Sequence, residues 1–89
     1  MAERQATIAS SSGLHARPAK LFVQAVQEKP VPVTIAVEGG ADLNAGSILS
    51  LTGLGAAQGT VVTLKAEGEG AEQALDDLVT LLETDLDAE

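Results

Sequence analysis

The sequence contains no cysteine, tryptophan or tyrosine, and its single aromatic residue is Phe22. Without cysteine there are no disulfide bonds or thiolate metal ligands, and with one histidine a protein zinc site is not expected either. Basic residues are also scarce: five Lys and Arg stand against thirteen Asp and Glu, so the formal net charge at pH 7 is −8. This composition argues against nucleic-acid binding, which depends on phosphate neutralisation and base stacking.

Long apolar runs are missing as well. No stretch approaches the roughly 20 apolar residues that a membrane span requires, and Met1 to Gln5 lacks the apolar region of a secretory signal. We therefore expect a cytoplasmic protein with no membrane insertion, no metal and no cofactor. The chain of 89 residues has the length of one domain, so we predict a single domain over residues 1–89 with a core that needs no disulfides.

Alternating apolar residues predict half-buried strands in three segments. These segments run from Gln5 to Ala9, from Val31 to Val37 and from Thr60 to Ala66. Glycines 39 and 40 form a predicted turn, after which Ala41 to Asn44 can add a short further strand. Each long strand has one apolar face, which is typical of a sheet covered on one side.

Apolar residues at helical spacing predict three helices. The first extends from about Ala16 to Glu28 and ends before Pro30, because a residue preceding proline disfavours the helical conformation. The second begins at Ser47, whose hydroxyl can cap it, and ends at about Gly53. The third runs from about Ala71 to Leu82 or beyond. The order βαββαβα predicts an α/β open-faced sandwich, in which three helices cover one face of a four-stranded antiparallel sheet.

The segment Gly13-Leu14-His15-Ala16-Arg17-Pro18-Ala19 holds the only histidine. Pro18 is tolerated in a first helical turn, so His15 is predicted at or just before the helix N-terminus. The backbone N–H groups of Ala16 and Arg17 and the helix dipole favour an anion there and keep the imidazole neutral. The Arg17 guanidinium can hold phosphate oxygens in two places. The residues alone indicate an anion-binding terminus with a candidate nucleophile, and an inert histidine is the open alternative.

Other motif-like stretches carry no predicted chemistry. The glycines from Gly53 to Gly59 follow a helix and open a strand, which reverses the order that a dinucleotide-binding fingerprint requires. The pairs Glu67/Glu69 and Asp76/Asp77 have no histidine nearby in the sequence to make them an acid and a base. We interpret the acidic C-terminal part as a solvated helix face.

The segment Gly13 to Ala19 resembles the active-site signature of HPr, the histidine-containing phosphocarrier family of the bacterial phosphotransferase system. A second block, from Ala45 to Leu51 and on through Gly59 to Val62, is similar to the regulatory-serine region and last strand of that family. The resemblance spans essentially the whole chain and implies the open-faced sandwich. It also implies a monomeric carrier that receives a phosphoryl group on His15 from an Enzyme I-type kinase, with phosphoenolpyruvate as the source, and passes it to an EIIA-type sugar-transport component.

The resemblance further implies roles for individual residues. The carrier is a stoichiometric intermediate rather than a turnover enzyme; His15 accepts the phosphoryl group, on Nδ1 by family precedent, and Arg17 stabilises its charge with help from the N–H groups of Ala16 and Arg17. Leu14 and Phe22 are expected to hold the loop against the core. The residues expected to contact the docking partners are Lys20, Leu49 and Leu51.

Ser47 matches the serine that a dedicated kinase phosphorylates in many members of the family. It is therefore the regulatory candidate, with a serine kinase and phosphatase as the corresponding partners. Gly46 stands where many members carry lysine, and Ser50 replaces a frequently basic or small residue, so kinase control of Ser47 stays open. Ser12, where other members often have asparagine, is a smaller departure.

Two alternative functions belong to other classes of protein. One is an HPr-like signalling module, in a nitrogen-type branch or a dihydroxyacetone-kinase relay, that binds regulators according to its phosphorylation state. The other is a small interaction domain in which His15 is inert. Phosphoryl acceptance that is lost in His15→Ala separates a carrier from the second of these.

Overall fold

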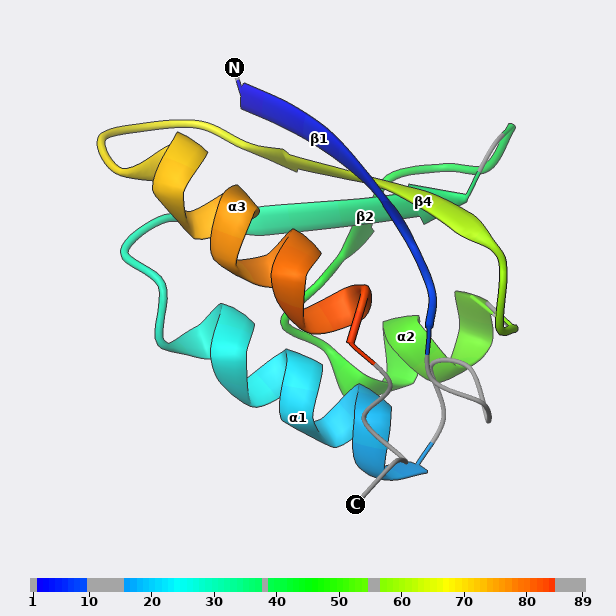
Figure 1. Ribbon diagram of the computed structural model, residues 1–89. Helices are drawn as coiled ribbons and strands as arrows, with labels where there is room; N and C mark the ends of the chain where they lie inside the picture. The colour runs from blue at the N-terminus through cyan, green and yellow to red at the C-terminus, as the bar shows by residue number, and fades with distance from the viewer. Residues whose placement is uncertain (1, 10–15, 38, 55–56, 85–89) are drawn as a thin grey trace.

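The computed structural model describes residues 2–9, 16–37, 39–54 and 57–84. The elements follow in the order β1 (Ala2–Thr7), α1 (Ala16–Gln27), β2 (Val33–Val37), β3 (Leu43–Asn44), α2 (Ile48–Leu54), β4 (Val61–Ala66) and α3 (Ala71–Leu82). The predicted order βαββαβα and the open-faced sandwich are confirmed: the helices lie to one side of a single sheet (Figure 1). None of the described helices is long and apolar enough to cross a membrane.

The four strands form one antiparallel sheet in the order β1-β4-β2-β3. β1 pairs with β4 along its whole length, from Ala2 opposite Ala66 to Thr7 opposite Val61. On its other side β4 pairs with β2. The end of β1 therefore lies beside the start of β4, although some fifty residues of sequence separate them.

The core lies between the sheet and the helices. The strand faces predicted from the alternation are confirmed, since Ala6, Ile8, Val62 and Leu64 are all at most 2% exposed. Helix α1 contributes Phe22, which is 0% exposed. Helix α3 contributes the apolar stripe Ala71, Ala74, Leu75, Leu78 and Leu82. Burial of these side chains is the main favourable term in the folding of such a domain.

All four strands differ from the prediction at one boundary or both, since β2 begins at Val33 rather than Val31 and β4 begins at Val61 rather than Thr60. β1 covers Ala2–Thr7 rather than Gln5 to Ala9, because Glu3 and Arg4 pair with β4 even though charged residues obscure the alternation there. β3 consists of Leu43–Asn44 alone instead of Ala41 to Asn44. A strand at the edge of a sheet has one neighbour, here β2, and its pairing is limited to these two residues.

Candidate functional site

Helix α1 begins at Ala16, so the residue that follows His15 is the first helical residue, as the sequence predicts. His15 itself and Leu14 lie outside the described residues, and so does the side chain of Arg17. The first turn is held by Pro18 and Ala19, which are both buried in the core. The position of the helix start is therefore fixed by packing immediately after the histidine.

The start of α1 is electropositive. The first turn contains no acidic residue. It contains Arg17, whose guanidinium group carries a formal positive charge. The N–H groups of a first turn have no acceptor within the helix, and the helix dipole places about half a positive charge there. Lys20 is exposed one turn further on. In a chain with a net charge of −8, this terminus combines the charge of Arg17 with the positive end of the helix dipole.

The strand end that precedes the histidine segment is tied to two other elements. Ile8 N–H donates a hydrogen bond of 2.9 Å to Thr60 O at the start of β4. Ala9 N–H donates one of 3.0 Å to Leu82 O at the end of α3. Figure 1 shows the ends of β1 and α3 and the starts of α1 and β4 gathered at one end of the molecule.

Ser47 directly precedes α2 and caps it, which confirms the predicted structural role. Its Oγ accepts a hydrogen bond of 3.4 Å from Ser50 N–H, the third residue of the helix. The preceding turn is held by Asn44, whose Oδ1 accepts a 2.9 Å hydrogen bond from Gly46 N–H. Gln27 Nε2 donates to Gly46 O at 3.3 Å and so joins the end of α1 to this turn. Ser47 thus lies in an ordered turn against α1.

The three docking candidates differ in exposure. Leu49 is 80% exposed and Lys20 is also on the surface. Leu51 is 0% exposed and belongs to the core, so its prediction as a docking residue is wrong. Residues that are two positions apart in a helix point about 200° away from each other around its axis. The helix that exposes Leu49 therefore buries Leu51. Ile48, which is 43% exposed, lies beside Leu49 and was missed as a surface residue.

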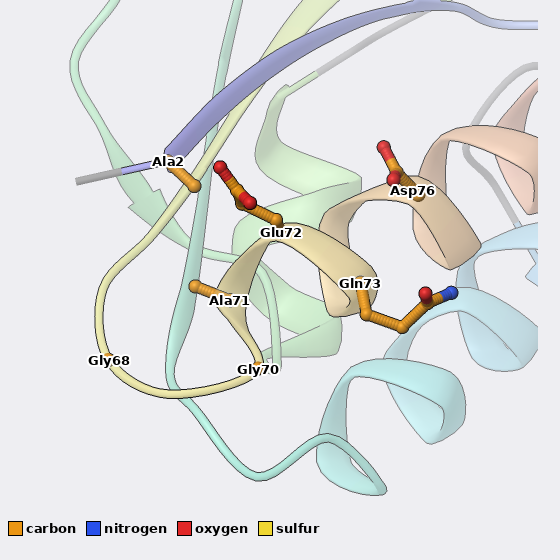
Figure 2. Close-up of a pocket in the computed structure, with 7 residues that line it drawn as sticks. All are labelled: Ala2, Gly68, Gly70, Ala71, Glu72, Gln73 and Asp76. Carbon is orange, nitrogen blue, oxygen red and sulfur yellow. The ribbon is translucent and has the colours of Figure 1, made fainter.

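A hollow of about 630 Å³ lies at the start of α3, at the other end of this helix from Leu82. Figure 2 shows the carboxylate side chains of Glu72 and Asp76 on its α3 side. Its other lining residues are Ala2, Gly68, Gly70, Ala71 and Gln73. With 12 residues, α3 is about 18 Å long, which separates this acidic hollow from the electropositive start of α1. The described residues contain no cluster of three side chains suited to a metal ion.

Known proteins have sequences similar to that of this chain. The family described as "PTS HPr component phosphorylation site" matches residues 2–84. Phosphocarrier protein HPr of Streptomyces coelicolor is 48% identical over 82 residues, which cover 92% of this chain and 88% of the relative. Phosphocarrier protein HPr of Vibrio cholerae is 39% identical over 83 residues, which cover 93% of this chain and 96% of the relative.

Solved structures of HPr proteins have the same fold as this chain. The crystal structure of HPr-C-His from Thermoanaerobacter tengcongensis superimposes with a TM-score of 0.91 at 39% identity, covering 100% of this chain and 99% of that one. The phosphocarrier protein HPr of Bacillus anthracis gives a TM-score of 0.86 at 32% identity, covering 91% and 95%. The open-faced sandwich and the matched phosphorylation-site region define a class of small proteins with a phosphorylation site. The chain belongs to the HPr family of phosphocarrier proteins of the phosphotransferase system.

Proposed function

We propose that this chain accepts a phosphoryl group on His15 from an Enzyme I-type kinase, with phosphoenolpyruvate as the source, and passes it to an EIIA-type component. The observation that carries the proposal is the start of α1 at Ala16, with no acidic residue in its first turn. In the sequence His15 directly precedes this electropositive helix terminus, which supports the proposal. The family match over residues 2–84 supports the same reading.

The proposed chemistry needs a neutral imidazole and a stabilised phosphoryl group. The lone pair of His15 Nδ1 forms the new N–P bond, while the bond from phosphorus to the donor breaks and its electron pair leaves with the donor. Charge on the transferring oxygens is spread in a loose transition state. Arg17 and the N–H groups of Ala16 and Arg17 are the groups that stabilise this charge. In the second transfer the acceptor's nucleophile forms the new bond to phosphorus, while the N–P bond on His15 breaks and its electron pair returns to Nδ1.

Both partners must reach the same small surface in turn. We assign Lys20 and Leu49 to that surface, since both are exposed, and we add Ile48, which lies next to Leu49. The carrier is proposed to act as a single domain and a monomer in the cytoplasm. It is a stoichiometric intermediate, because the phosphoryl group that it receives leaves again with the next protein.

Control through Ser47 is a second proposed role, and its place in the structure favours it. Ser47 lies at the start of α2, directly before the exposed residues Ile48 and Leu49. A phosphate on Ser47 is compatible with a helix start, so the fold would survive the modification. Its charge of about −2 would stand beside the proposed docking residues and weaken the approach of partners.

The test is the intact mass of the protein after incubation with phosphoenolpyruvate, magnesium and an Enzyme I from the same organism. We expect a gain of one phosphoryl group that is labile in acid and stable in alkali. The gain should be absent in His15→Ala and present in Ser47→Ala. Labelling that persists in His15→Ala would show that another residue is the acceptor, and no labelling of the wild type would contradict the carrier function.

A further inference from the structure

Strand β1 lies at the edge of the sheet, with β4 on one side and no further strand of the described residues on the other. Backbone groups along an antiparallel strand point alternately to its two sides. Ile8 N–H donates a hydrogen bond of 2.9 Å to Thr60 O, so the even-numbered residues of β1 direct their N–H and C=O groups toward β4. Glu3, Gln5 and Thr7 direct theirs away from β4, and all three residues are exposed. An edge of this kind is a template on which another strand can pair.

Two of these outward backbone groups are already bound, one toward each end of the strand. Arg4 Nη1 donates a hydrogen bond of 2.8 Å to Glu3 O. Arg4 Nε lies 3.2 Å from Asp76 Oδ1 on α3, and this ion pair holds the guanidinium beside the strand. Thr7 N–H donates to Glu83 Oε2 at 3.5 Å, directly after the end of α3. Side chains that α3 positions therefore occupy the free edge of β1.

The spacing of the two contacts shows that they belong to one arrangement. Arg4 and Thr7 are three residues apart in the sequence, which is about 10 Å along a strand. Asp76 and Glu83 are seven residues apart, which is also about 10 Å along a helix. Figure 1 shows α3 extending alongside β1. Both contacts therefore form together when the helix packs along the strand.

We propose that Arg4 and Glu83 prevent the β1 edge of one molecule from pairing with the β1 edge of a second copy of this chain. Two antiparallel β1 strands related by a two-fold axis at Gln5 place Glu3 of each copy opposite Thr7 of the other, so that no like charges face each other. In this register Glu3 O would accept the N–H of Thr7 from the other copy. These are the two groups that Arg4 and Glu83 bind. The proposal is independent of phosphoryl transfer and accounts for the proposed monomer.

The test compares Arg4→Ala/Glu83→Ala with Lys29→Ala/Asp77→Ala. Each double variant loses one basic and one acidic side chain, so the formal net charge stays at −8. Each also loses an ion pair of α3, but the pair of Lys29 and Asp77 joins α3 to α1 rather than to β1. Sedimentation velocity over a range of protein concentrations measures self-association, and circular dichroism measures the folded fraction. If a double variant folds incompletely, Glu83→Ala is compared with Asp77→Ala in the same way.

A further substitution, Gln5→Pro, is added to Arg4→Ala/Glu83→Ala to test where the two copies pair. Proline has no N–H group, and it is tolerated on an edge strand where that group would face away from the neighbouring strand. The N–H of Gln5 faces away from β4, so the substitution removes no hydrogen bond between β1 and β4. It does remove the donor at the centre of the proposed pairing. Hydrogen exchange of the Gln5 amide, followed by NMR in the proteins that keep Gln5, reports on the same position.

We expect the wild type and Lys29→Ala/Asp77→Ala to be monomers. Arg4→Ala/Glu83→Ala should form dimers, with an association constant raised about tenfold or more, the scale of two freed hydrogen bonds. Exchange of the Gln5 amide should slow in these dimers, and Gln5→Pro should return the protein to a monomer. A double variant that stays monomeric at millimolar concentration would overturn the proposal. Equal association of the wild type or of the control variant would also overturn it, and so would dimers that persist with Gln5→Pro.

Discussion

Lys29 Nζ lies 3.0 Å from Asp77 Oδ2, and this ion pair joins the end of α1 to α3. Gln73, one turn earlier on α3, donates a hydrogen bond to the other carboxylate oxygen of Asp77. The hydrogen bond from Lys29 and then that from Gln73 hold the pKa of Asp77 below its ordinary value of 3.8. The ionised form of Asp77 is therefore favoured in the folded protein.

A lowered pKa in the folded state predicts a particular dependence of stability on pH. The contribution of Asp77 is complete above the ordinary value of 3.8 and is lost as the pH falls through the lowered value. We expect wild type to be more stable than Asp77→Asn in urea at neutral pH, and this difference to shrink in acid. Glu72→Gln, on the exposed face of α3, serves as the control. A difference that is the same at neutral pH and in strong acid would contradict the prediction.

Arg17→Ala should slow phosphoryl transfer while leaving the fold unchanged. Loss of one group that stabilises the transition state costs about 2–4 kcal/mol, which corresponds to a reduction of tens- to thousands-fold. The rate is measured under single-turnover conditions, and circular dichroism with thermal melting reports the fold. Lys20→Ala removes a positive charge one turn further along α1 and should act on partner affinity instead. Equal rates for Arg17→Ala and wild type would leave Arg17 without an electrostatic role.

Alanine substitutions of Leu51 and of Leu49 should separate an effect on stability from an effect on docking. Leu51 is fully buried, so Leu51→Ala is expected to lower the free energy of unfolding by about 2–5 kcal/mol. Leu49 is 80% exposed, so Leu49→Ala should change it by no more than about 0.5 kcal/mol. Denaturant unfolding measures both. Titration calorimetry with Enzyme I should show weaker binding for Leu49→Ala, and unchanged binding would remove Leu49 from the docking surface.

Ser47→Ala removes the oxygen that caps α2 and should destabilise the protein by about 1 kcal/mol. Ser50→Ala is the matched control, because Ser50 takes part in the cap through its backbone N–H. Ser47→Asp keeps a capping oxygen and adds a negative charge, so it should retain stability and slow transfer from Enzyme I. Thermal melting and transfer rates distinguish these effects. A fast Ser47→Asp variant would argue against control of docking by charge at this position.

Much of the fold can be predicted from local patterns. The alternation of Ala6 and Ile8, and of Val62 and Leu64, indicates which face of each strand is buried, and the structure confirms both faces. Pro18 predicts the start of α1 because proline is compatible with a first turn and little else in a helix. These signals are local, since each depends on residues within one element.

The rest depends on contacts between distant residues. A helix of seven residues such as α2 has too few positions to define an apolar stripe, so the sequence does not reveal that Leu51 faces the core and Leu49 faces solvent. No pattern links Gln58 to Ala9, because their hydrogen bond exists only once β1 lies beside β4. The start of α1 is thus predictable from its neighbours in the sequence, whereas the hydrogen bond between Gln58 and Ala9 is not.

The pairing of β1 with β4 has a consequence for synthesis of the chain. β1 emerges from the ribosome before β4, and more than fifty residues are made between the end of β1 and the start of its partner strand. Translation proceeds at about 5–20 residues per second, so several seconds pass between the synthesis of β1 and the synthesis of its partner strand. A shortened product that lacks β4 would thus contain the complete histidine motif without the strand that joins β1 to the rest of the sheet.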